Sequence, residues 1–270
     1  MNPQTLRQIS GILRLELRSC LFGRRALATY FLAFAPVGLM LLGVLIAQLQ
    51  DQPDDFGNAP LAFAVIFHSY LRTSIFLACL ILFMSLFRSE IMRKSLHYYF
   101  LTPVRREVLV VGKYLAALIS AVVIFSIATT LLYILMMLPW GFGNLSRHLF
   151  QGPGLGHLLA YVGVSALACF GYGAVFLLVG LFLRNPVVGA VIIWAWEAIN
   201  FVLPVLLKKA SVIFYLRSLY PVPLPEEVFA VVADPISPWL SVPGLVLFTA
   251  AVPALAGFRA RGMEINYGDD

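Results

Sequence analysis

The sequence has little charge, and this scarcity excludes most classes of protein. Only 12% of its 270 residues are charged, about half the roughly 25% of an average soluble domain. By contrast, 61% are hydrophobic and the mean hydropathy is +0.90. A water-soluble fold needs more charged surface, and disordered, collagen-like and nucleic-acid-binding chains have other compositions. The composition is that of a polytopic membrane protein.

Motifs for catalysis, metal binding and disulfide frameworks are also missing. The three cysteines lie far apart without a CxxC pair, and the four histidines do not form an HExxH motif. Gly112-Lys113 is followed by Tyr114 and lacks the upstream glycine of a phosphate-binding loop. Glu226-Glu227 lacks the arginine of an EExxxR motif, and no GxSxG is present. We therefore predict that the chain is not an enzyme and holds no metal or cofactor.

The sequence instead contains six long apolar runs. Each run meets the roughly 17–25 residues that a helix needs to cross about 30 Å of hydrocarbon, and helices satisfy their own backbone hydrogen bonds in lipid. We predict an all-α membrane protein with six transmembrane helices. The six runs are Ala26–Leu49, Leu61–Phe87, Leu109–Leu138, His157–Leu183, Val187–Leu207 and Trp239–Gly257.

The positive charges indicate the orientation. Fourteen Lys and Arg residues fall on the side of the two termini, and four fall on the other side. The first loop on that other side carries Asp51, Asp54 and Asp55 instead. By the positive-inside rule, both termini are cytoplasmic in a plasma or inner membrane. This distribution also accounts for the net charge of +6 without a nucleic-acid partner.

Three further segments fit the surfaces of the membrane. Pro3–Phe22 has apolar residues at helical spacing and arginines elsewhere, which predicts an amphipathic helix in the cytoplasmic interface. Arg88–Leu101 predicts a second, short cytoplasmic helix between spans two and three. The outer segment Lys208–Pro238 alternates apolar stretches with prolines, which predicts short outer helices. We therefore divide the chain into an interfacial helix (1–25), a six-span domain (26–257) and a cytoplasmic tail (258–270).

Two charges lie deep within the apolar runs. Arg72 is near the middle of run two and Glu197 is near the middle of run five, where such side chains face protein or water and not lipid. Their similar depth predicts a direct or water-bridged pair, within one subunit or across a dimer interface. His68 lies one helical turn from Arg72, and Trp194 shares a stripe with Glu197. A packing role, a place in a transport pathway and a proton relay all remain open for these four residues.

The loop between runs two and three resembles a known family. Its motifs are Glu90-Ile-Met-Arg-Lys-Ser-Leu96, Leu101-Thr-Pro-Val-Arg-Arg106 and Gly112-Lys-Tyr-Leu115. Together they are similar to the signature of type-2 ABC transporter permeases, although Lys94-Ser95 stands where that family usually has Gly-Thr. The predicted architecture is also similar along the whole chain.

The resemblance implies the membrane subunit of an ATP-driven ABC exporter. Such a subunit forms the pathway as a homodimer, or with a paralogous permease, and binds separate ABC ATPase subunits in the lipid bilayer. The residues that the resemblance assigns to coupling with the ATPase are Glu90, Met92, Arg93, Lys94, Leu96, Thr102, Pro103 and Arg105. Two alternatives stay open: a six-span secondary transporter that uses Arg72, Glu197 and His68, and a membrane anchor subunit that does not transport.

Overall fold

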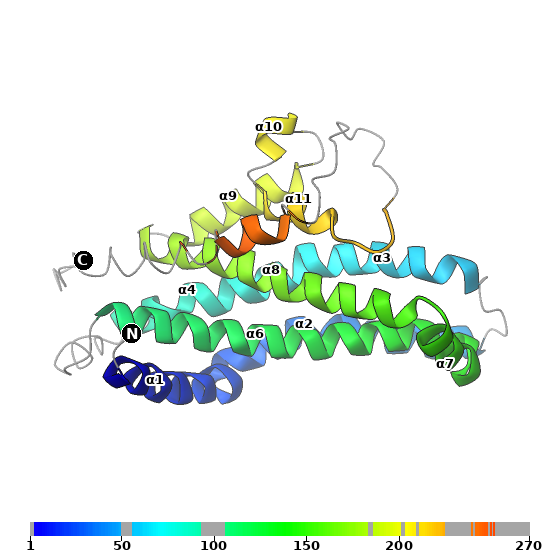
Figure 1. Ribbon diagram of the computed structural model, residues 1–270, viewed down its shortest axis with the longest axis horizontal. Helices are drawn as coiled ribbons and strands as arrows, with labels where there is room; N and C mark the ends of the chain where they lie inside the picture. The colour runs from blue at the N-terminus through cyan, green and yellow to red at the C-terminus, as the bar shows by residue number, and fades with distance from the viewer. Residues whose placement is uncertain are drawn as a thin grey trace.

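A computed structural model describes residues 3–49, 56–92, 106–182, 186–200, 203–208, 211–224, 239, 241–247, 249 and 251. All regular secondary structure in these ranges is helical. The long helices run side by side along the molecule (Figure 1). The elements are α1 (Pro3–Phe22), α2 (Arg24–Leu49), η1 (Phe56–Asn58), α3 (Ala59–Tyr70), η2 (Leu71–Ile75), α4 (Phe76–Met92), α6 (Arg106–Met137), η3 (Leu138–Trp140), α7 (Phe142–Gln151), α8 (Gly154–Phe182), α9 (Pro186–Ala198), α10 (Val205–Lys208) and α11 (Val212–Arg217).

The first four apolar runs form helices as predicted. Four segments within them are long and apolar enough to cross a membrane, and they are Ala26–Ile46, Ala59–Met84, Val108–Trp140 and Gly154–Gly180. The second run combines α3, η2 and α4 into one nearly continuous helix. Its central segment η2 is π-helical, a form that is rare and frequent at functional sites.

The fifth run differs from the prediction of one uninterrupted span. It forms α9, which has 13 residues and is about 20 Å long at 1.5 Å per residue. A turn at Ile199-Asn200 follows, and α10 comes four residues later. The carbonyl groups of Glu197 and Ala198 at this end of the helix accept hydrogen bonds from a side chain of another helix, as the next section describes. Of the sixth run, the described residues from 239 to 251 are helical.

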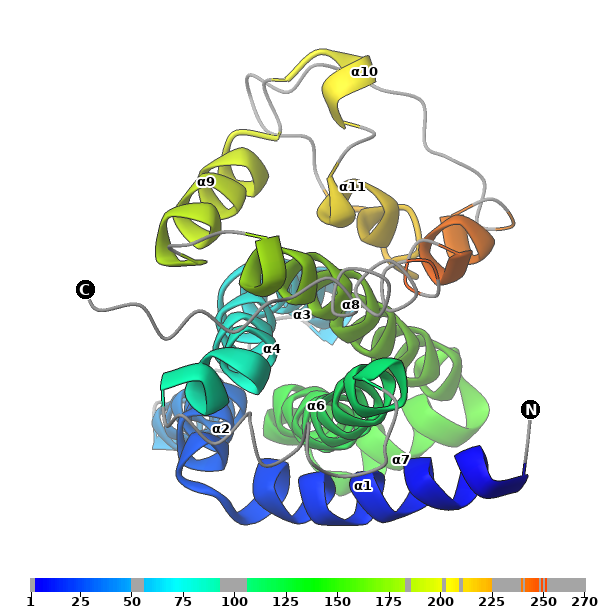
Figure 2. The ribbon, with the colours of Figure 1, turned by 90° about the vertical axis from the view of Figure 1, so that its left-hand side faces the viewer.

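The predicted N-terminal amphipathic helix is confirmed as α1. Gly23 lies at the turn between α1 and α2. A Cβ at this position would lie 2.3 Å from the carbonyl oxygen of Ser19, so this turn requires glycine. Figure 2 looks along α2, α4 and α6 and shows α1 passing across the ends of α2 and α6. The exposed side of α1 includes Arg14 and Arg18, as its periodicity predicted.

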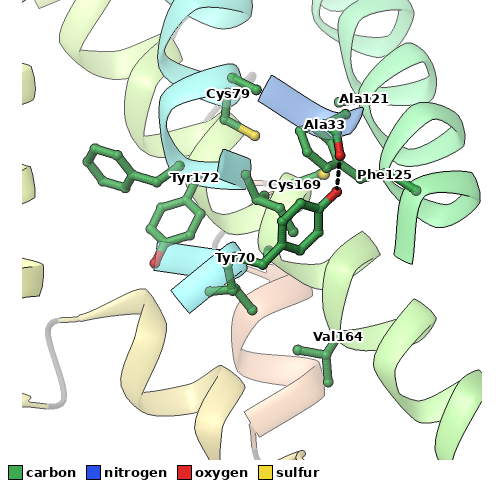
Figure 3. Packing of buried hydrophobic residues seen from close by; sticks show 14 of the residues in the cluster. Ala33, Tyr70, Cys79, Ala121, Phe125, Val164, Cys169 and Tyr172 are labelled. Carbon is green, nitrogen blue, oxygen red and sulfur yellow. Dashed lines mark hydrogen bonds between the residues drawn. The ribbon is translucent and has the colours of Figure 1, made fainter. Parts of the chain in front are cut away.

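The core lies where α2, α4, α6 and α8 meet. Figure 3 shows Cys79 of α4 beside Cys169 of α8, with the Tyr70 hydroxyl donating to the carbonyl oxygen of Ala33 at 3.2 Å. Small residues let α8 approach its neighbours. A Cβ at Gly173 would lie 2.6 Å from the ring of Phe83, so this glycine admits an aromatic side chain against the α8 backbone.

Candidate functional site

The two charges that lie deep in the apolar runs, Arg72 and Glu197, meet at one place, which we call the polar node. It consists of His68, Arg72, Glu197, Ser211 and Tyr220. These residues come from α3 and η2, from the end of α9, and from the chain just before and just after α11. The polar node thus joins three segments that are far apart in the sequence.

Arg72 lies on the π-helical segment η2 and reaches the end of α9. Its guanidinium Nη2 donates hydrogen bonds to the carbonyl oxygens of Ala198 at 2.9 Å and Glu197 at 3.2 Å. The last carbonyl groups of a helix have no partner within the helix and carry partial negative charge. Arg72 therefore provides hydrogen bonds to two carbonyl groups at the C-terminus of α9.

The Glu197 carboxylate accepts hydrogen bonds from the start of a helix, whereas Arg72 donates them to the end of one. Oε2 accepts from the Ser211 hydroxyl at 2.6 Å and from the Ile213 amide at 3.4 Å, and Oε1 accepts from the Val212 amide at 3.0 Å. The side chain is only 6% exposed. The carboxylate thus binds the amide groups at the start of α11, where a negative charge complements the helix dipole.

The predicted pairing of Arg72 with Glu197 takes a different form from the one expected. The two residues do meet, but the guanidinium binds the backbone carbonyl of Glu197. The carboxylate turns toward α11, because Ser211 and two backbone amides offer it three donors. Both charges are held within the protein, as their depth predicted.

The other two predicted residues, His68 and Trp194, differ in whether they contact the node. His68 is within the node, because its Nδ1 is 3.2 Å from the Tyr220 hydroxyl. Trp194 is 51% exposed, and it makes no described hydrogen bond with the node. Sequence reasoning missed Ser211 and Tyr220. Ser211 did leave a signal, because a serine directly before an apolar stretch is a common helix N-cap.

The hydrogen bonds of the node hold helix ends together. Among the described residues, no group of three or more His, Cys, Asp or Glu side chains could hold a metal ion. The amide Nδ2 of the nearby Asn200 is buried and has no hydrogen-bond partner among the described residues. What the node can do is tie α9 and α11 to the middle of the second span.

A second site lies at the opposite end of α6 from α7. Lys113 is 1% exposed, and its Nζ lies 2.6 Å from Oε1 of Glu16 on α1, which is 17% exposed. The neighbouring Gly112 leaves room for Ile12, since a Cβ there would lie 2.9 Å from Ile12 Cγ2. We call these four residues the α1 contact. They explain why a Gly-Lys pair stands early in α6.

The residues predicted to couple to an ATPase lie beside this second site in the sequence. Glu90 and Met92 belong to the last turn of α4. Those outside the described residues are Arg93, Lys94, Leu96, Thr102, Pro103 and Arg105. Comparisons of the chain with protein-family models, curated proteins and solved structures found no match.

Proposed function

We propose that this chain is the permease subunit of an ATP-driven ABC export system. It spans the membrane six times with both termini in the cytoplasm, forms the translocation pathway as a dimer, and binds separate ATPase subunits. The segment from Glu90 to Arg105 is its docking element. ATP is hydrolysed in the partner, because this chain has no phosphate-binding loop.

The α1 contact is the observation that carries this proposal. The first motif part, Glu90–Leu96, begins in the last turn of α4, and the second, Leu101–Arg106, ends at the first residue of α6. The third, Gly112-Lys113, binds the amphipathic helix α1. The last turn of α4 and the first turns of α6 lie at the same end of the bundle as α1 (Figure 1). A displacement of the docking segment would move α6 directly, and it would move α1 through the contact between Lys113 and Glu16.

The test is whether the docking segment couples ATP hydrolysis to transport. We expect mild-detergent purification of the full-length chain to retain an ATPase subunit, identified by mass spectrometry. The double change Arg93→Glu with Leu96→Asp should leave ATPase activity uncoupled from transport in proteoliposomes. A single exposed ion pair contributes only about 1 kcal/mol or less, so the change at Leu96 is needed to disturb the apolar contact as well.

Controls separate coupling from misfolding. A reporter placed after Asp55 should remain external in the double variant, which shows normal insertion. Arg147→Glu, a charge reversal on exposed Arg147 of α7, should leave coupling unchanged. Normal coupling in the double variant, or purification without any ATPase, would contradict the proposal.

A proton-coupled secondary transporter is the second candidate function. The observation that favours it is the meeting of His68, Arg72 and Glu197 in one partly buried node, with Arg72 on the π-helical segment η2. Such a transporter would drive substrate flux from a pH gradient in the absence of nucleotide. Flux that persists in proteoliposomes without ATP and an ATPase subunit would favour it over the first candidate.

A further inference from the structure

The helix α7 lies at the end of the bundle opposite to α1 (Figure 1). It follows η3 at the end of the third span and precedes the fourth span, which begins with α8. Gly141, with a φ of 87°, turns the chain into α7, because glycine adopts positive φ values readily. Nε2 of His148 lies 3.2 Å from the hydroxyl of Tyr133, so α7 folds back beside α6 and does not extend it.

The side chains of α7 form rows of residues four apart, because such positions are neighbours on a helix surface. Leu145 is buried and Leu149 packs against the core, so their row faces the bundle. Another row, which we call the aromatic row, consists of Phe142, Ser146 and Phe150. All three are exposed, the two phenylalanines by 76% and 79%. The aromatic row is therefore an apolar surface that the bundle does not cover.

The row beside the aromatic row is polar. It consists of Gly143, Arg147 and Gln151, which are all exposed, and we call it the polar row. The helix α7 thus has one side on the bundle, one apolar side and one polar side. This is the pattern of a helix at the boundary of protein, hydrocarbon and water, where the apolar side enters the acyl chains and the polar side faces the headgroups.

The length of α6 places α7 at the depth of a membrane surface. Lys113 of α6 binds the amphipathic helix α1, and from Lys113 to Trp140 the chain is helical throughout. At 1.5 Å per residue this segment rises about 40 Å, which matches the roughly 40–45 Å of a bilayer with its headgroup regions. Trp140 itself is of a residue type that is enriched at membrane–water interfaces. The helices α1 and α7 are therefore one bilayer thickness apart, which places them in opposite interfaces.

We propose that α7 is a membrane-surface anchor whose aromatic row binds the acyl chains of the leaflet opposite to α1. The polar row then faces the headgroups and water, and Leu145 holds the helix on the bundle. Exposed Leu155 and Leu159 continue the apolar surface in the first turns of the fourth span. The anchor fixes the depth of the bundle at the end that α1 does not reach. It requires that the chain is inserted in a membrane but not that it belongs to an exporter, so a failed coupling experiment leaves it unaffected.

Collisions of spin labels with two reagents test the anchor, because molecular oxygen concentrates in hydrocarbon and a polar nickel chelate stays in water. The full-length chain with Cys20→Ser, whose other two cysteines are buried, is reconstituted in vesicles of phosphatidylethanolamine and phosphatidylglycerol. A nitroxide at Ser146→Cys reports on the aromatic row, and one at the adjacent Arg147→Cys reports on the polar row. A reference label at Leu159→Cys, which is 63% exposed on the fourth span, gives the ratio for hydrocarbon. We expect the ratio of oxygen to nickel collision rates to be several-fold higher at position 146 than at position 147.

Variants of the two rows show whether the phenylalanines hold α7 in the lipid. Phe142→Gln with Phe150→Gln should lower the ratio at position 146 to that at position 147, because the row then has no apolar side chain to insert, while the reference label keeps its ratio. Gln151→Ala in the polar row is the matched control and should leave the ratio at position 146 unchanged. Without these changes, equal ratios at positions 146 and 147 would mean that water surrounds α7. Low collision rates of both reagents at position 146 would mean that a second copy or another protein covers the aromatic row. Either result, or an unchanged ratio in the double variant, would overturn the proposal.

Discussion

The two sites handle buried charge in opposite ways. At the α1 contact, Lys113 and Glu16 bind each other directly at 2.6 Å. At the polar node, Arg72 binds the carbonyl groups at the end of α9, and Glu197 binds the amides at the start of α11. The first arrangement joins two helices through their sides, and the second joins helices through their ends.

The difference follows from where the helices stop. Helix α1 and helix α6 are long and satisfy most of their own backbone groups, so a side chain between them needs another side chain. Helices α9 and α11 are short and end within the protein, so their terminal carbonyl and amide groups require partners there. A charged side chain is the strongest available partner for such groups.

The largest expected effect is at Glu197. Glu197→Ala would leave the Ser211 hydroxyl and the Val212 and Ile213 amides without their acceptor. Each buried donor left unsatisfied costs about 1–3 kcal/mol, so we expect a loss of roughly 3–5 kcal/mol in the free energy of unfolding. Unfolding in a denaturing detergent, followed by circular dichroism, measures it.

Glu197→Gln provides the matched control for this prediction. Its side-chain carbonyl keeps one acceptor for the start of α11, so it should lose about half as much stability as Glu197→Ala. A stability of Glu197→Ala within about 0.5 kcal/mol of the unsubstituted chain would mean that the carboxylate does not hold α11.

Whether a helix could be predicted from the sequence depends on the hydrophobic period and the length of its segment. The runs behind α2, α6 and α8 are long and uninterrupted, so their helices followed directly. The run behind α9 looked the same, but its length does not reveal where the chain turns. The break at Ile199-Asn200 is held by contacts with Arg72 and with α11, which are distant in sequence.

The sites were predictable to different degrees for the same reason. The depth of Arg72 and Glu197 in apolar runs predicts that both face protein or water. Their backbone partners could not be predicted before the helix ends were known. Glu16 was overlooked, although it is the single carboxylate in the basic helix α1. An acidic residue that shares a face with Ile12 on such a helix is a usable signal for a buried cation partner.

The second prediction compares the coupling energies of the two sites in double-mutant cycles. Lys113→Met and Glu16→Gln should be coupled by about 1–3 kcal/mol, because each single change removes one member of a direct ion pair. Arg72→Met and Glu197→Gln should add to within about 0.5 kcal/mol, because they disturb different helix ends. The measurement is again the free energy of unfolding in detergent.

This pair of cycles can fail in two distinct ways. Recovery of stability in the Arg72→Met, Glu197→Gln double variant would support the direct or water-bridged pair that sequence depth predicts. Additive effects at Lys113 and Glu16 would show that α1 is held by its apolar contacts alone. Either result would remove the distinction between helix sides and helix ends.

The smallest expected effect tests the apolar part of the α1 contact at Gly112. Gly112→Val would place a branched side chain where a Cβ alone would already lie 2.9 Å from Ile12 Cγ2. Overpacking of this kind costs about 1–3 kcal/mol, and a shift of α1 would also lengthen the Lys113–Glu16 contact. Ile12→Ala should restore part of the loss by making room.

At Gly43 of α2 nothing lies within 4 Å of an added Cβ, so Gly43→Ala should be neutral or stabilising by up to about 1 kcal/mol, as expected for alanine over glycine in a helix. If Gly112→Val behaves like Gly43→Ala, α1 does not pack against α6 at this point. If only Gly112→Val increases hydrogen exchange in α1, and Ile12→Ala reverses it, the contact is specific and the ion pair depends on it.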